Sequence, residues 1–183
     1  MLKSLVEDNV ALLEQSHGLI AALSPELYAV PPAGRRGGPG AHVRHILDHY
    51  LALIDGVPTG RVDYEARVRD ERLERDPELA LATIAGIVER LRALDESAAP
   101  RRLHVVSDGH TGESTLPREL LFLLSHTVHH QALLALLLQP RGVEVDECFG
   151  VAPSTLRHWG RLAPDAPLRD AIAVPVHAGP DYA

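Results

Sequence analysis

The stretch Thr115–Gln139, TLPRELLFLLSHTVHHQALLALLLQ, predicts a long helix that is apolar on nearly all of its sides. Thr115 stands at its start, Pro117 lies in its first turn, and Gln139-Pro140 ends it. A helix of this kind is stable in water only when other elements enclose it. The remainder of the chain is therefore expected to supply helices that pack around this one.

Three other segments have the apolar spacing of amphipathic helices. They cover residues 2–23, about 40 to 56, and 76 to about 97. The third of them begins with Asp76-Pro77, a capping residue followed by a proline that suits the first helical position. Together with the apolar helix, these segments predict an all-α protein built as a four-helix bundle.

The connecting segments add smaller features. Residues 61–75 are rich in charge, and we expect a solvated connection with too little apolar content to join the core. Residues 102–115 alternate briefly and predict a short hairpin or loop before the last long helix. Ser154 is a candidate N-cap for a small C-terminal helix. The expected organisation is a single domain over 1–162, followed by a mobile tail over 163–183.

Composition narrows the function. The 183 residues suit one domain, and 18 basic against 25 acidic residues give a net charge of −7. That balance argues against binding to nucleic acid or to an anionic membrane surface. No apolar run resembles a signal peptide or a membrane span, so we expect a cytoplasmic protein. The lone Cys148 excludes an internal disulfide and a paired-cysteine metal site.

Histidine is unusually abundant, with 11 copies, and most of them fall in two short windows. His42, His45 and His49 lie within about 60° of one another on the second predicted helix. His126 and His130 are one turn apart on the fourth, a spacing that lets two imidazoles converge on one ion. A third ligand from the second helix would complete a three-histidine site with open positions.

The histidine pattern leaves two matters open. Neutral imidazole binds zinc, nickel and iron alike, so the donor set does not choose the divalent ion. The alternative without a metal is a set of surface histidines or of hydrogen-bonded core histidines. A zincin peptidase is disfavoured, because that class uses HExxH and Thr127 follows His126 here.

Two carboxylates have both a functional and a structural interpretation. Glu119 lies two turns before His126 and could act as an acid or base, although a carboxylate at the start of a helix is also favoured by the helix dipole. Asp48 could orient a ligand histidine or face solvent. Cys148 is interpreted as a small apolar filler. None of these residues is assigned a catalytic role.

Four stretches together resemble the DinB-like (DinB/YfiT) superfamily of metal-binding four-helix-bundle proteins. They are HVRHILDHY (42–50), VDYEAR (62–67), RELLFLLSHTVHHQAL (118–133) and FGVAPSTLRHW (149–159). The resemblance covers roughly residues 1–160. It implies a four-helix bundle, a homodimer, and a divalent metal held by one histidine of the second helix and a later HxxxH pair.

Carried over position by position, the HxxxH pair is His126 and His130. The histidine of the family's second helix is typically followed by two apolar or small residues and an acidic one, which matches His45-Ile46-Leu47-Asp48. The implied ligands are therefore His45, His126 and His130, while His49, Asp48, His42 and His129 are alternative ligands or neighbours of the site.

The resemblance also implies an activity. It points to a metal-dependent enzyme, a thiol-dependent S-transferase or a related isomerase, that activates a low-molecular-weight thiol or water at the metal. Its partners would be a small-molecule substrate and a thiol such as mycothiol, bacillithiol or glutathione. Many family members continue HxxxH with Arg-Gly-Gln, whereas Gln131-Ala132-Leu133 follows here. The alternative is a non-catalytic metal-binding or stress-response bundle that acts as an interaction module.

Overall fold

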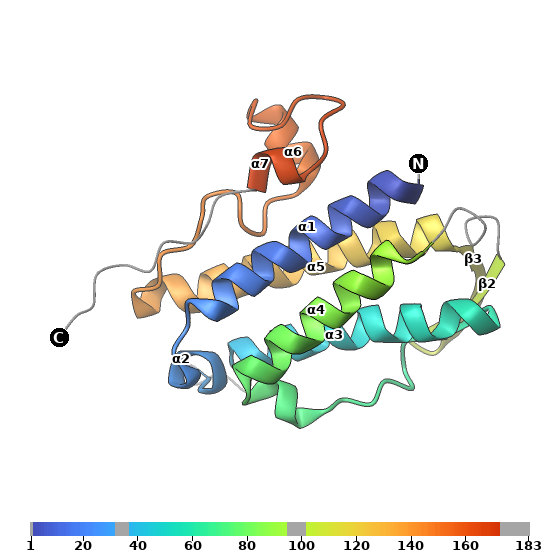
Figure 1. Ribbon diagram of the computed structural model, residues 1–183, viewed down its shortest axis with the longest axis horizontal. Helices are drawn as coiled ribbons and strands as arrows, with labels where there is room; N and C mark the ends of the chain where they lie inside the picture. Colours follow the sequence, from blue (N-terminus) through green and yellow to red (C-terminus); the bar gives the residue numbers. More distant parts are fainter. Residues whose placement is uncertain (1, 32–36, 95–101, 173–183) are drawn as a thin grey trace.

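The computed structural model describes residues 2–31, 37–94 and 102–172. Its four long helices are α1 (Leu2–Ala21), α3 (Pro39–Gly56), α4 (Pro77–Arg92) and α5 (Leu116–Leu138). Both α1 and α3 pack against α4 and α5, so the four helices enclose one apolar core (Figure 1). The four predicted helices are therefore present. The expected end of the third, at residues 97–100, lies outside the described residues.

Side chains cap the helices where the sequence predicts starts. Asp76 Oδ1 accepts a hydrogen bond from the Leu79 amide at 3.0 Å at the start of α4. Thr115 Oγ1 accepts one from the Arg118 amide at 3.4 Å at the start of α5. Each cap satisfies an amide that has no partner within its helix. A short helix, α2 (Pro25–Ala29), follows Ser24 in the same manner.

A three-stranded sheet corrects the all-α expectation. Its strands are β1 (Arg61–Asp63), β2 (Arg102–Ser107) and β3 (His110–Thr115). The β2–β3 hairpin confirms the expected hairpin, and its turn has positive φ at Asp108 (51°) and Gly109 (75°), which is typical of a type I′ turn. Strand β1 runs parallel to β2 and was not predicted.

The charged segment 61–75 was wrongly expected to stay out of the core. Val62 is fully buried, Tyr64 is 3% exposed, and Leu73 is 4% exposed in the 3-10 helix η2 (Glu71–Glu74). Because side chains alternate along a strand, Val62 and Tyr64 face the core while their charged neighbours face solvent. The alternation spans too few residues to stand out against the surrounding charges.

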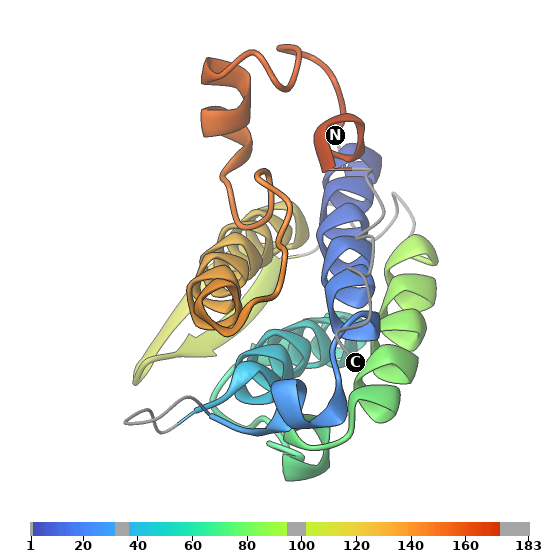
Figure 2. The ribbon, with the colours of Figure 1, turned by 90° about the vertical axis from the view of Figure 1, so that its left-hand side faces the viewer.

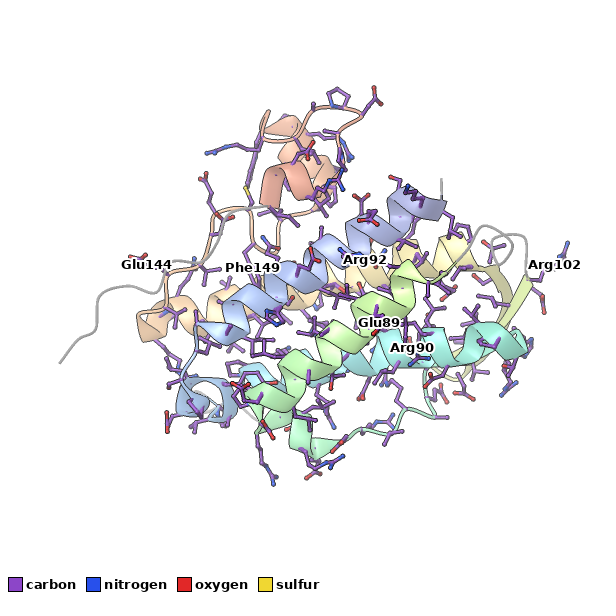
Figure 3. All side chains as sticks on the ribbon, viewed as in Figure 1. Glu89, Arg90, Arg92, Arg102, Glu144 and Phe149 are labelled. Carbon is purple, nitrogen blue, oxygen red and sulfur yellow. The ribbon has the colours of Figure 1, made fainter. Side chains whose placement is uncertain are left out.

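The C-terminal part of the described chain packs across α1 and α5. It contains α6 (Pro153–His158) and α7 (Arg169–Ile172); α7 lies beside the N-terminal part of α1, and α6 stands apart from α1 (Figure 2). The N-cap of α6 is Ala152, which makes no side-chain cap hydrogen bond, so the prediction of Ser154 as the N-cap was wrong. Phe149 is 5% exposed where this segment meets the bundle core (Figure 3).

A second apolar cluster extends past the expected domain boundary at residue 162. Leu168 and Ile172 are buried in it together with side chains of α1 and α5, and the Leu168 amide donates to Asp8 Oδ1 at 2.9 Å. Contacts with the helices therefore continue to residue 172, and residues 173–183 lie outside the described part. Burial raises the pKa of Cys148 in this cluster, in keeping with an apolar filler.

By length and composition, Leu116–Arg141 is the one stretch among the described residues that could cross a membrane. No stretch of this kind was expected from the sequence. Such a stretch is weak evidence, because the core helix of a globular protein passes the same test. Here α5 packs against α1 and α3 and carries the histidines described below.

Close backbone approach at Gly40 yields a stability prediction. A Cβ at this position would overlap the backbone of Glu74 at the end of η2. We expect Gly40→Ala to lower the free energy of unfolding by about 1–3 kcal/mol, because neither backbone can move freely. Gly86→Ala is the matched control, since a Cβ there meets nothing within 4 Å and alanine favours the interior of α4. Urea denaturation of both variants measures the difference, and equal stabilities would contradict the close approach.

Candidate metal centre

Five histidines of α3 and α5 form one cluster where these helices pack together. The ring centroids of His45 and His126 lie 4.9 Å apart, and that of His130 is 4.6 Å from each of them. His49 lies 4.2 Å from His126, and His42 lies 5.3 Å from His130. The two histidine stripes of the sequence therefore face each other.

The nitrogens of this cluster are close enough to share an ion. His45 Nε2 and His126 Nε2 are 3.1 Å apart. Two nitrogens bound to one tetrahedral zinc ion are separated by about 3.3 Å, given bonds of 2.0–2.1 Å. One ligand nitrogen from each of His45, His49 and His126 falls in a group in which all three lie within 4.8 Å of one another. This three-histidine group fits a metal site.

His130, the third predicted ligand, has a different partner. Its Nδ1 lies 3.0 Å from His42 Nδ1, so one of these two nitrogens donates to the other. This contact orients the His130 ring, and it does not involve the Nε2 atom of His130. His129 is exposed and touches His130 only through ring contact, at 5.1 Å between centroids.

His49 is held from two sides. Its Nδ1 donates to the backbone carbonyl of His45 at 2.7 Å, which assigns the proton of a neutral ring to Nδ1. Its Nε2 is then an acceptor, and it is in close contact with Nη1 of Arg67. The lone pair that a metal would use is therefore engaged by a guanidinium.

The cluster is electrically neutral at pH 7. The pKa values of His45 and His49 are lowered to about 4 and that of His130 to about 3, and burial is the largest cause in each case. Burial and the other histidines lower the pKa of His126 to about 2. Neutral imidazoles offer lone pairs to a cation, whereas protonated ones repel it.

One polar atom of the cluster is left without a partner. His126 Nδ1 is buried and makes no hydrogen bond within the described part of the chain. An unmet polar group of this kind costs about 1–3 kcal/mol. An ion bound to Nε2, the nitrogen near His45, would leave Nδ1 still without a partner, so the fit to a metal rests on the donor set and not on this atom.

Two aromatic rings cover the cluster on the side of the sheet. Tyr64 stacks on His49 with centroids 5.4 Å apart, and Phe122 stacks on His126 at 5.6 Å.

Tyr64 donates its hydroxyl to Glu119 Oε2 at 2.9 Å, and Ser114 donates to Oε1 at 2.5 Å. Glu119 is 2% exposed and holds Tyr64 in place, so it is more than a carboxylate at the start of a helix.

A buried polar network beneath the cluster joins three helices. Tyr50 of α3 donates to Asn9 Oδ1 of α1 at 2.7 Å and lies 3.1 Å from Thr127 Oγ1 of α5. All three side chains are fully buried. Because Thr127 follows His126, this network fixes the register in which α5 presents its histidines to α3.

Asp48 had two interpretations, a carboxylate that orients a ligand histidine or one that faces solvent. It is 5% exposed, and burial raises its pKa. Within the described residues it makes no hydrogen bond to a histidine. Tyr64, Arg67 and Phe122 were not predicted as residues of the site, although the alternation of Val62 and Tyr64 was a signal for Tyr64.

A cavity of about 510 Å³ opens beside the cluster. His42, His45 and His130 form its polar wall together with Arg44, whose Nε lies 3.0 Å from Glu74 Oε1. Leu133, Leu136 and Leu137 of α5 form the apolar wall. The cavity is large enough for a small organic molecule.

The fold and the histidine cluster agree with the comparison against known families. The family described as the DinB superfamily matches residues 10–134, which is more than half of the chain and includes all five clustered histidines. The chain belongs to the DinB superfamily. Searches of curated proteins and of solved structures find no significant match.

Proposed function

We propose that the protein binds one divalent metal ion through His45, His126 and His130 at the centre of a four-helix bundle. The distance of 3.1 Å between His45 Nε2 and His126 Nε2 carries this proposal, because it brings two neutral donors from different helices within the range of one ion. Membership of the DinB superfamily supports it.

His130 is preferred to His49 as the third ligand. His130 lies 4.6 Å from both other rings, and its contact with His42 uses Nδ1 only. His49 is nearer to His126, but Arg67 already donates to its Nε2. A cation at that nitrogen competes with the metal for the same lone pair and repels it.

We propose further that the site belongs to a thiol-dependent S-transferase or a related isomerase. A divalent ion with three histidine ligands would lower the pKa of a thiol or water at an open position. His42 holds the ring of His130, while Tyr64 and Phe122 limit water on the side of the sheet. The cavity of about 510 Å³ would receive the small-molecule substrate.

The metal content and thiol consumption of the purified protein test this proposal. Zinc, nickel and iron are measured first, and the loaded protein then receives glutathione, or mycothiol or bacillithiol, with 1-chloro-2,4-dinitrobenzene. In the transfer, sulfur bonds to the ring carbon, chloride leaves, and the thiol proton passes to buffer. We expect thioether formation that His126→Ala abolishes. A loaded protein that forms no thioether would favour the non-catalytic interaction module.

The resemblance to the family also leads us to propose a homodimer located in the cytoplasm. Light scattering coupled to gel filtration gives the oligomeric state directly. A monomeric mass at micromolar concentration would contradict the dimer.

A further inference from the structure

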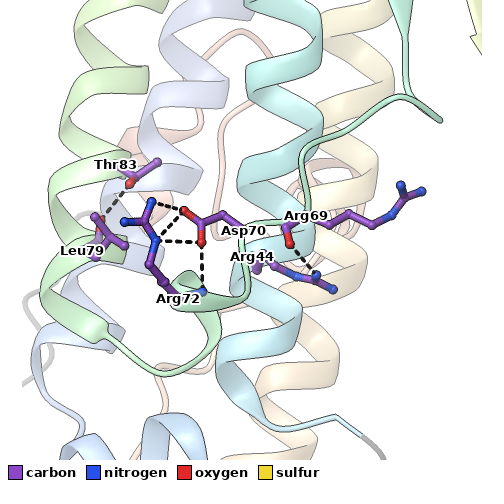
Figure 4. Close-up of polar contacts among 6 residues, drawn as sticks. All are labelled: Arg44, Arg69, Asp70, Arg72, Leu79 and Thr83. Carbon is purple, nitrogen blue, oxygen red and sulfur yellow. Dashed lines mark hydrogen bonds and ion pairs between the residues drawn. The ribbon is translucent and has the colours of Figure 1, made fainter.

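Arg67 contacts the histidine cluster from a firmly held backbone segment. Asp63 Oδ1 accepts hydrogen bonds from the amides of Glu65 and Ala66, both at 3.0 Å, just before Arg67. Two residues after Arg67, the carbonyl of Arg69 accepts from Arg44 of α3 at 3.5 Å (Figure 4). Arg69 has a φ of 54°, which is uncommon for a residue other than glycine. The segment thus fixes where the Arg67 side chain enters the protein.

The partner of Arg67 is unusual for this part of the chain. Arg61 pairs with Asp63 at 3.3 Å, Arg72 with Asp70 at 2.6 Å, and Arg75 with Glu71 at 3.5 Å. Arg67 has no carboxylate within ion-pair distance among the described residues and contacts His49 instead.

The position of Arg67 costs free energy of folding, because its charged side chain is only partly exposed to solvent. Arg67 is half-buried between the exposed residues Ala66 and Val68, and its Nε is buried without a hydrogen-bond partner in the described chain. A buried charged group with an unmet donor costs more than a neutral one. Stability alone therefore does not explain an arginine at this position. Its effect on His49 offers an explanation.

That effect concerns the number of ligands available to a metal. His45, His49, His126 and His130 together would supply four imidazoles, and four protein ligands close a tetrahedral site. Of these four, His49 alone has its acceptor nitrogen engaged by a guanidinium. With His49 withheld, three imidazoles remain and one position stays open for an exogenous ligand.

We propose that Arg67 is a positioning residue that keeps His49 out of the coordination sphere and so preserves an open position for a small thiol at the metal. This inference rests on the proposed metal site. Arg67 acts through His49, and it need not touch either the ion or the thiol. Removing the guanidinium would release His49 Nε2, which would then convert an open three-histidine site into a closed four-histidine site.

Cobalt(II) is a suitable probe, because its visible spectrum reports both the coordination number and the binding of sulfur. In the wild-type protein, 2-mercaptoethanol should add a sulfur-to-cobalt charge-transfer band. In Arg67→Gln we expect cobalt to bind about tenfold more tightly, as for gain of a ligand, and the thiol band to require at least tenfold more 2-mercaptoethanol. Arg67→Lys, which retains a cationic donor, should behave nearly like the wild type.

Two further variants separate this role from a structural one. Arg67→Gln combined with His49→Gln should restore the thiol titration of the wild type, because the added ligand is then gone. Arg75→Gln removes the same charge from an exposed position in the same part of the chain and should change neither spectrum nor affinity. Thermal unfolding of each variant shows that it is folded.

The outcomes distinguish the inference from the proposed function on which it rests. Failure of the wild type to bind cobalt would overturn both. Normal cobalt binding by the wild type, together with an unchanged spectrum and thiol titration in Arg67→Gln, would overturn the role of Arg67 alone. The same conclusion would follow if the double variant kept the defect of the single one.

Discussion

Replacing His126 with alanine is expected to lower the affinity for a divalent metal by more than about 100-fold, since loss of residues that merely support a ligand already costs 10–100-fold. His126 has the central place in the cluster, with ring contacts to His45, His49 and His130. Its Nε2 also lies 3.1 Å from His45 Nε2. Competition with a chromophoric zinc chelator measures the affinity of each variant.

His129→Ala is the matched control for this measurement. His129 lies on the same helix between His126 and His130, but its side chain is exposed. Its removal should leave zinc affinity within about twofold of the wild type, as for a surface substitution that touches no ligand. Equal affinities in His126→Ala, His129→Ala and the wild type would contradict the proposed site.

The same assay decides the third ligand. His130→Ala should weaken zinc binding nearly as much as His126→Ala, whereas His49→Ala should weaken it far less. The reverse order would show that His49 is the ligand and that Arg67 leaves its nitrogen when the ion binds.

The second large effect is an acid-induced loss of stability in the metal-free protein. The four histidines with the most lowered pKa stay neutral in the folded state down to about pH 4, whereas unfolded histidines take up protons from about pH 6.5. The unfolded state therefore binds more protons between these values. Linkage then requires that stability, fully present above pH 6.5, falls as the pH decreases toward 4.

Circular dichroism of the chelator-treated protein between pH 8 and pH 4.5 checks this expectation. The midpoint of thermal unfolding should be nearly constant above pH 7 and should fall steeply below pH 6.5. His45→Gln combined with His126→Gln removes two of the lowered pKa values and should make the fall shallower. A midpoint that does not change with pH would show that the cluster takes up protons in the folded state.

Much of the fold was predictable because its signals are local. Asp76-Pro77 and Thr115 mark the starts of α4 and α5 by capping chemistry that involves only neighbouring residues. The two histidine stripes follow from helical periodicity, and the structure shows them facing each other. The brief alternation over residues 102–115 likewise predicted a short hairpin or loop, and the structure shows the β2–β3 hairpin there.

Strand β1 and the burial of Tyr64 were missed for a physical reason. A strand of three residues has almost no periodicity, and its partner β2 lies some 40 residues further along the chain. Burial of Leu73 depends in the same way on a distant element, since its carbonyl accepts from the Tyr28 hydroxyl at 2.5 Å. The local pattern alone predicts neither contact, because the alternation of Val62 and Tyr64 is too short to stand out.

The sequence by itself determined the four long helices, the DinB resemblance and the histidines that can share an ion, because spacing along a helix fixes which side chains lie on one face. Only the tertiary structure decided that Arg67 engages His49 and that His42 pairs with His130. These contacts depend on how α3, α5 and the segment after β1 pack together. The availability of each nitrogen to a metal is set by that packing and not by sequence spacing.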